Sequence, residues 1–176
     1  MKYNKLIYLV LFYYLISSSG AYSIERPDIN NLIIHKEKKK IEKLEFFNSK
    51  NKKVSLDSYQ SNLIIINFWA TWCAPCKEEM PHLSRLKSKK QFKDIEILPI
   101  NIADEKLEKS KEFFQELNIN NLEIFYGSSV NLAKVFNLRG VPTSIIIDKD
   151  GYEFARVIGY IDFENKSFLK WLSNHL

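Results

Sequence analysis

The sequence predicts an α/β protein in which helices cover both faces of a mixed β-sheet. Residues 63–69 form a nearly continuous run of β-branched and aromatic side chains, as expected of a strand that is buried on both faces. Segments with strand character alternate along the chain with segments of helical periodicity, which favours a sheet flanked by helices. Hydrophobic residues make up 45% of the chain and aromatic residues 14%, which is enough for a core and excludes a largely disordered protein.

The individual elements follow from local patterns. Residues 44–47 and 54–56 are expected to pair as a hairpin, because polar turn residues separate them. The central strand leads into a helix that ends near residue 90, and Pro75 is tolerated in its first turn. The later elements are expected in this order: a strand over 96–102, a helix over 105–117, a short strand over 122–126, a helix over 130–136, a strand over 144–148, a turn over 148–151, a strand over 154–158 and a helix over about 163–175.

Residues 1–23 have the order of residues found in an export signal. Lys2 and Lys5 precede the apolar run 6–16, and small residues follow up to Ser23. Because this run is shorter than the roughly 20 residues of a membrane helix, cleavage after Ser23 is the favoured interpretation. The alternative is an uncleaved anchor over about 6–22. Either way we expect the protein outside the cytoplasm, on the periplasmic side, with a polar tether over 24–43 and a folded domain over 44–176.

The charge of the chain does not indicate nucleic-acid binding. The formal net charge is +5 and falls to +3 without Lys2 and Lys5. This small excess is interleaved with acidic residues, whereas a nucleic-acid site needs clustered positive charge. The lysine-rich stretch 36–40 is interpreted as a solvated strip, with contact to an anionic membrane surface as the alternative.

The chain contains two cysteines, Cys73 and Cys76, three positions apart at the junction of a strand and a helix. An isolated pair of this spacing favours redox chemistry over a disulfide scaffold. Cys73 at the helix N-terminus meets free N–H groups and the positive end of the helix dipole, which stabilise a thiolate. We therefore expect Cys73 to be the nucleophile and Cys76, one turn further along, to resolve the mixed disulfide. The alternatives are a structural bridge and half of a metal site.

A complete metal site is not expected. Zinc usually takes four ligands, but there is no second cysteine pair. The histidines His35, His82 and His175 are scattered along the sequence, and His82, although it lies on the helix of the cysteines, is expected to have a surface or packing role. No metal and no other cofactor is predicted.

Two motifs carry a resemblance to a known family. Residues 68–76 read FWATWCAPC, and residues 140–143 read GVPT. In this order and context they resemble the TlpA/ResA branch of the thioredoxin-like proteins, and the similarity covers about residues 44–176. It implies a thioredoxin-like mixed sheet flanked by helices, with an N-terminal hairpin and a central α/β insertion over 105–136.

The resemblance also implies a binding surface for the substrate. Pro142 would follow a cis peptide bond from Val141 and lie against the two sulfur atoms. The exposed backbone of Val141 could then bind an extended client segment as an added strand. Trp72, directly before the nucleophile, is expected to form an exposed apolar rim for partners, whereas Trp69 is expected in the core.

The resemblance further singles out Glu79 as a catalytic residue. Plain thioredoxins carry a buried aspartate where this chain has Asn67, which cannot act as a base. In the resembling branch a glutamate three residues after the second cysteine takes over part of its role, and Glu79 stands at that position. Helical spacing places it next to Cys76, whose proton it could accept or deliver. The alternative is a solvated acid, as expected for Glu78.

The sequence therefore predicts an exported thiol-disulfide oxidoreductase with a redox-active Cys73–Cys76 pair. It would reduce disulfides in extracytoplasmic client proteins and be recharged by a membrane-linked thiol donor. The resemblance implies clients in cytochrome c or copper-oxidase maturation. The alternatives are a disulfide oxidase or isomerase, and a copper-binding or copper-delivery module, for which a third ligand would be needed.

Overall fold

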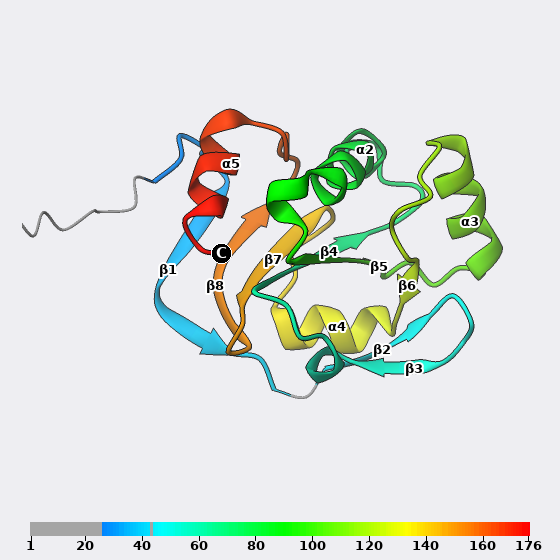
Figure 1. Ribbon diagram of the computed structural model, residues 1–176. Helices are drawn as coiled ribbons and strands as arrows, with labels where there is room; N and C mark the ends of the chain where they lie inside the picture. The colour runs from blue at the N-terminus through cyan, green and yellow to red at the C-terminus, as the bar shows by residue number, and fades with distance from the viewer. Residues whose placement is uncertain (1–25, 43) are drawn as a thin grey trace, which may run out of the picture.

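The structure is a computed structural model that describes residues 26–42 and 44–176. Its centre is an eight-stranded mixed sheet with the strand order β1-β8-β7-β4-β5-β6-β2-β3 (Figure 1). The strands are β1 (Leu32–Lys40), β2 (Glu45–Asn48), β3 (Lys53–Ser55), β4 (Leu63–Trp69), β5 (Ile95–Asn101), β6 (Phe125–Tyr126), β7 (Thr143–Asp148) and β8 (Tyr152–Ile158). The helices are α2 (Ala74–Ser88), α3 (Leu107–Glu116), α4 (Ser129–Phe136) and α5 (Lys166–Ser173), with 3-10 turns at η1 (Leu56–Ser58) and η2 (Lys90–Phe92).

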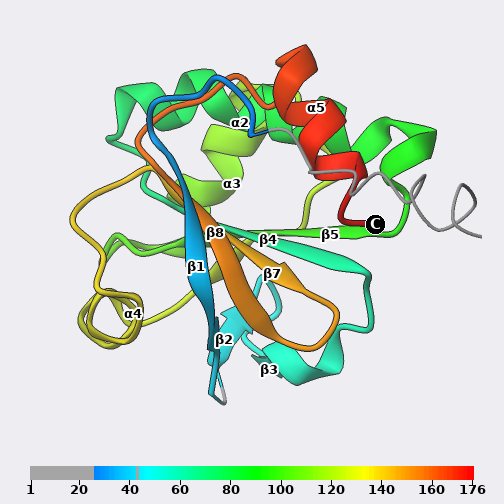
Figure 2. The ribbon, with the colours of Figure 1, turned by 90° about the vertical axis from the view of Figure 1, so that its left-hand side faces the viewer.

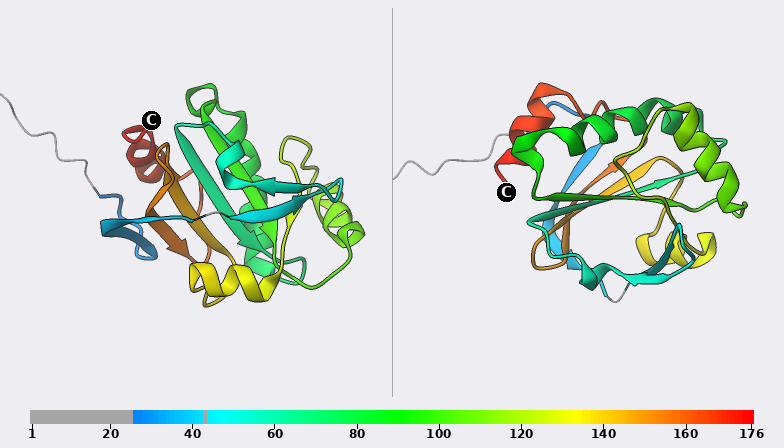
Figure 3. Two further views of the ribbon diagram at one scale, coloured as in Figure 1. Left: turned by 90° about the horizontal axis from the view of Figure 1, so that it is seen from below. Right: turned by 45° about the vertical axis from the view of Figure 1, so that its right-hand side comes forward.

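Strand β4 is the middle of the sheet, as its apolar run predicts. It pairs in parallel with β5 and antiparallel with β7, and all seven of its residues are buried. Because side chains alternate along a strand, Leu63 and Ile65 enter the core under α2 and α5, whereas Ile64 and Ile66 enter the core on the side of α4. Figure 3 shows α2 and α4 on opposite faces of the sheet. The predicted α/β sheet with helices on both faces is confirmed.

The carboxyl end of β4 positions the site. The chain leaves β4 at Trp69, turns, and enters α2 at Ala74, so the two cysteines lie at the edge where the parallel strands β4 and β5 end. The N-terminal hairpin of β2 and β3 pairs with the short strand β6 of the insertion. The predicted hairpin and central α/β insertion are therefore both present.

The prediction of a polar tether over residues 24–43 is wrong for residues 32–40. These residues form β1, which lies antiparallel to β8 at the edge of the sheet (Figure 2). Leu32 is fully buried opposite Val157. The exposed lysines that follow suit an edge strand, because charged side chains there prevent pairing with another chain.

A buried ionic network joins β1 to β8. Glu153 is only 3% exposed, and its carboxylate accepts hydrogen bonds from Arg156 Nε at 2.6 Å and Nη2 at 2.8 Å. The ring Nε2 of His35 on β1 lies 2.6 Å from the same carboxylate. Burial opposes ionisation of Glu153, but Arg156 and His35 outweigh it and lower the pKa of this carboxyl. Residue 35 is thus part of the folded domain.

The signal or anchor predicted over residues 1–23 lies outside the described residues. Within the part of the chain that the structure describes, no helix combines the length and the apolar character needed to cross a bilayer.

Candidate active site

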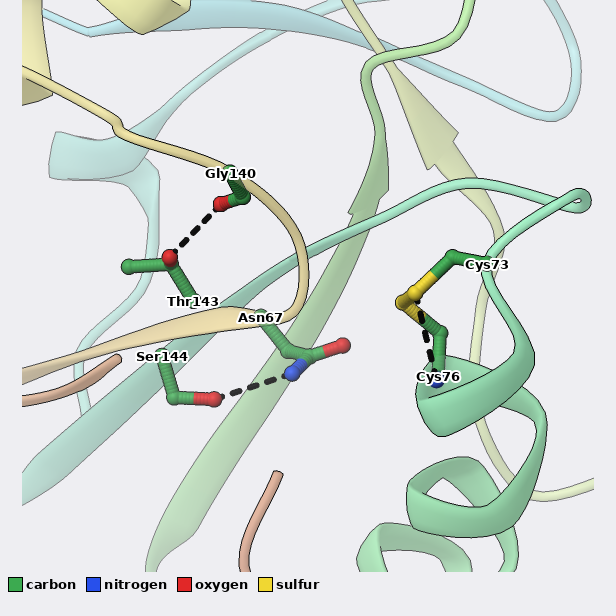
Figure 4. The surroundings of a disulfide bond; sticks show 6 residues. All are labelled: Asn67, Cys73, Cys76, Gly140, Thr143 and Ser144. Atoms are coloured by element: carbon green, nitrogen blue, oxygen red, sulfur yellow. Dashed lines mark hydrogen bonds between the residues drawn. A yellow bond between two sulfur atoms is a disulfide. The ribbon is translucent and has the colours of Figure 1, made fainter. Parts of the chain in front are cut away.

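Cys73 and Cys76 form a disulfide at the first turn of α2 (Figure 4). Cys73 is the N-cap residue of the helix, and its Sγ accepts a hydrogen bond from the backbone N–H of Cys76 at 3.2 Å. The first N–H groups of a helix have no partner within the helix, and an oxygen of the N-cap side chain normally accepts from one of them. Here a sulfur atom is the acceptor. The helix thus directs a donor and the positive end of its dipole at Cys73, which is the environment that stabilises a thiolate.

Exposure differs along the segment that carries the cysteines. Cys73 is 4% exposed and Cys76 is 1% exposed in this disulfide-bonded state. Trp69 is fully buried, whereas Trp72 is 73% exposed immediately before Cys73. The predicted burial of Trp69 and the predicted exposure of Trp72 are both confirmed. Both cysteines are therefore buried in the same core cluster, and an exposed apolar residue directly precedes Cys73 in the sequence.

The loop before β7 belongs to the surroundings of the disulfide (Figure 4) and carries the predicted cis peptide bond between Val141 and Pro142. Strand β7 places it there, because Thr143 pairs with Phe68 of β4. The hydroxyl of Thr143 donates to the carbonyl of Gly140 at 2.8 Å, which closes the turn (Figure 4). Val141 is half-buried and Pro142 is buried.

Asn67 is buried on the face of β4 that is covered by α2. Its amide nitrogen donates to Ser144 Oγ on β7 at 2.9 Å, and its oxygen points to the side of the disulfide (Figure 4). A neutral amide held in this way is no proton acceptor for Cys76, as the sequence predicts.

Glu79 is the buried acid of the site. It lies one helical turn after Cys76 and is 1% exposed. Burial raises its pKa to about 8. The Asn67 side chain and the backbone of Ile161 oppose this shift, but among the described residues neither carboxyl oxygen reaches hydrogen-bond geometry with a partner. Glu79 is therefore mostly protonated at neutral pH and is not a solvated acid.

His82, Asp162 and Glu164 are the group of described residues with a spacing suited to a metal ion. His82 Nδ1 lies 2.6 Å from Asp162 Oδ1. Glu164, however, already accepts from Arg85 Nε at 2.6 Å and lies 3.2 Å from Lys89 Nζ. Two cations thus balance this carboxylate, and the group is better described as a surface ion-pair network, which agrees with the role expected for His82.

One polar network next to the site was not predicted from the sequence. Thr71, in the turn before Cys73, donates from Oγ1 to Glu105 Oε2 at 2.7 Å. Asn101, the last residue of β5, donates from Nδ2 to Glu105 Oε1 at 2.8 Å. A signal for it exists in the sequence, because polar residues that follow two neighbouring parallel strands meet at the same edge of a sheet.

Comparisons with known proteins agree with this geometry. Residues 37–152 match the model of the AhpC/TSA family. A thiol-disulfide oxidoreductase ResA of Bacillus cereus is 27% identical over 163 residues, which cover 90% of this chain and 91% of ResA.

Two solved structures share the fold. The DsbF homologue from Corynebacterium diphtheriae superposes with a TM-score of 0.68 at 20% identity, covering 88% of this chain and 99% of that one. StoA from Bacillus subtilis gives a TM-score of 0.61 at 19% identity and covers 75% of this chain and 97% of its own. The chain therefore belongs to the AhpC/TSA family, in which it is a ResA-like thiol-disulfide oxidoreductase of the thioredoxin-like fold.

Proposed function

We propose that the protein is exported and reduces disulfide bonds in extracytoplasmic client proteins through Cys73 and Cys76. The observation that carries this proposal is the N-cap position of Cys73, whose sulfur accepts the N–H of Cys76, the residue one helical turn further along. An activated sulfur at the helix N-terminus, with a second sulfur one turn further along, is the arrangement needed for a two-step exchange.

In the first step the reduced protein attacks. The Cys73 thiolate forms a bond to one sulfur of the client disulfide, the client S–S bond breaks, and the second client sulfur leaves as a thiolate that takes up a proton. The exposed ring of Trp72 and the loop of Val141 and Pro142 provide the surface on which an extended client segment can lie beside Cys73.

In the second step Cys76 resolves the mixed disulfide. Its thiol loses a proton, its sulfur bonds to Cys73 Sγ, and the client leaves as a dithiol; two electrons have passed from the cysteine pair to the client. Glu79, buried one turn away, is the acceptor for this proton: with a pKa of about 8 a minor fraction of this carboxyl is ionised at neutral pH, and that fraction takes up the proton. When a donor dithiol later reopens the disulfide, protonated Glu79 can return the proton to the Cys76 sulfur. The sulfur pair carries the electrons, so no cofactor is required.

The wider assignment follows from the export signal and the resemblance. The N-terminal segment, cleaved or retained as a membrane tether, would place the domain on the periplasmic side of the membrane. A membrane-linked thiol donor would then recharge the pair, and the clients would be proteins of cytochrome c or copper-oxidase maturation. The similarity to ResA supports the thiol-disulfide chemistry of this proposal.

The reduction potential tests the direction of the reaction. Equilibration of the purified domain with glutathione buffers should give a potential closer to that of thioredoxin, about −270 mV, than to that of the oxidant DsbA, about −120 mV. A potential near the second value would instead identify an oxidase. Metal analysis of the same preparation addresses the copper-delivery alternative, which requires stoichiometric copper.

Trp72 offers a test of client binding. Trp72→Ala should lower the exchange rate with an unfolded disulfide-bearing protein about three- to tenfold, since an exposed aromatic contact is lost. The rate with a small aromatic disulfide should stay within about twofold, because that substrate does not need the rim. Val130→Ala is the matched control, because Val130 on α4 is 74% exposed and lies outside the site. Equal losses with both substrates would show that Trp72 does not bind clients.

A further inference from the structure

A nearly buried carboxylate is hydrogen-bonded to the loop that carries the nucleophile. The side chain of Glu105 is 9% exposed, and its Oε2 accepts the hydroxyl proton of Thr71 at 2.7 Å. Thr71 lies two residues before Cys73 in the short turn between β4 and α2. Glu105 belongs to the insertion, so this hydrogen bond joins two segments that are 34 residues apart.

The other side of Glu105 is fixed to the end of the sheet. Asn101, 2% exposed, donates from Nδ2 to Glu105 Oε1 at 2.8 Å and to Ser110 Oγ at 2.7 Å. Its Oδ1 accepts the backbone N–H of Ala103 at 2.7 Å. With every polar atom of its side chain in use, Asn101 cannot turn without losing hydrogen bonds. Glu105 therefore links the active-site turn to a rigid part of the core.

Glu105 is ionised at neutral pH. Burial opposes ionisation, but the hydrogen bonds from Asn101 and Thr71 outweigh it and lower the pKa of this carboxyl. The cation of α3 that faces it is Lys109, whose Nζ is 4.0 Å from Oε2 and is itself exposed. The charged residues that neighbour Glu105 and the cysteines in the sequence are Asp104 and Lys106 beside Glu105, and Lys77, Glu78 and buried Glu79 on α2. Glu105 is thus an anion that is hydrogen-bonded to the turn two residues before Cys73, and an anion near a thiol disfavours its thiolate.

We propose that Glu105 is a positioning residue for the exchange reaction: through Thr71 it holds the loop that presents Cys73, and its negative charge limits how acidic that thiol becomes. The proposal rests on Cys73 as the nucleophile of the proposed function. It requires neither a particular client nor a particular direction of electron flow.

A pH profile separates the two effects. The reduced protein is mixed with a small aromatic disulfide, and the rate of the first exchange step is measured across the titration of Cys73. The midpoint of the profile reports the acidity of Cys73, and the plateau at high pH reports how well its thiolate is presented.

Each substitution should change a different part of the profile. Thr71→Val removes the hydrogen bond but keeps the charge, so the plateau should fall about tenfold with an unchanged midpoint. Thr71→Ser restores the hydroxyl and should behave as the wild type. Glu105→Gln removes the charge but keeps the link, because its amide oxygen can accept from Asn101 Nδ2 while its amide nitrogen donates to the hydroxyl oxygen of Thr71. Its midpoint should fall by about half a pH unit, and its plateau should change less than about threefold.

The matched control is Glu108→Gln, which removes the same charge from an exposed position at the start of α3. Solvent screens this charge, so the midpoint should not move measurably. A wild-type plateau for Thr71→Val, or a midpoint for Glu105→Gln equal to that for Glu108→Gln, would overturn the proposal. Should Thr71→Val not fold, Thr71→Ala makes the same test. Since the assay contains no client, a protein that shows the expected profile but reduces no client would disprove the proposed function and leave this inference intact.

Discussion

The substitution Cys76→Ser is expected to leave the protein covalently attached to its clients. Without the resolving sulfur the first step still forms a mixed disulfide on Cys73, but no second thiolate can displace the client. Expression in cells followed by acid quenching and non-reducing electrophoresis should show adducts that disappear with dithiothreitol. Mass spectrometry of the adducts then identifies the clients, and thereby tests whether they belong to cytochrome c or copper-oxidase maturation.

The counterpart, Cys73→Ser, should form no adducts and should lose at least about 10³-fold in exchange rate, because the nucleophile itself is removed. The two variants remove one sulfur each from the same helical turn, so they are well matched. Adducts that form on Cys76 in Cys73→Ser, at the yield seen with Cys76→Ser, would reverse the roles assigned to the two cysteines.

The substitution Glu79→Gln is expected to change how stability depends on pH. The pKa of Glu79 is about 8 in the folded protein, against 4.5 as the ordinary value expected in the unfolded chain. Between these values the folded protein binds one proton more, so the free energy of unfolding falls as the pH rises from 4.5 to 8, by on the order of 5 kcal/mol. Glutamine is neutral throughout. The free energy of unfolding of the variant, measured by urea unfolding, should equal that of the wild type below pH 4.5 and exceed it by this amount above pH 8.

Glu78→Gln is the control for this experiment, since Glu78 is the exposed neighbour on the same helix. It should follow the wild-type curve. The same pair of variants tests the proton transfer: Glu79→Gln should slow resolution of a mixed disulfide by Cys76, and Glu78→Gln should not. Unfolding curves of Glu79→Gln that parallel those of the wild type would mean that the carboxyl is not buried in its neutral form.

The parts of the fold that were predictable are those in which one local pattern dominates. The unbroken apolar run of β4 can be satisfied only between two covered faces, and it specifies the centre of the sheet. The cysteine spacing after this strand specifies the helix N-terminus, and hence the position of Cys73. The roles of Glu79 and Pro142 were predictable only through the resemblance. The residues around Glu79 in the sequence do not show whether an acid there is buried or solvated, and those around Pro142 do not show whether its peptide bond is cis or trans.

Strand β1 could not be predicted because its sequence is polar. Only its first residues are apolar, and the strand is stabilised by pairing with β8, which is distant in the sequence. The ion pair of Glu153 and Arg156 could not be predicted from the sequence either, because it depends on an irregularity of the strand. Residues three apart on a regular strand point to opposite faces, but the register of β8 shifts between Glu153 and Ala155, and this bulge allows the two side chains to meet.

The most direct test of the whole account is the titration of Cys73 in the reduced protein, followed by its rate of alkylation with iodoacetamide across pH and assigned by peptide mass spectrometry. The account predicts a pKa clearly below the value of about 8.5 for free cysteine, with Cys76 alkylated far more slowly. A Cys73 thiol that titrates like free cysteine, or that reacts no faster than Cys76, would contradict it.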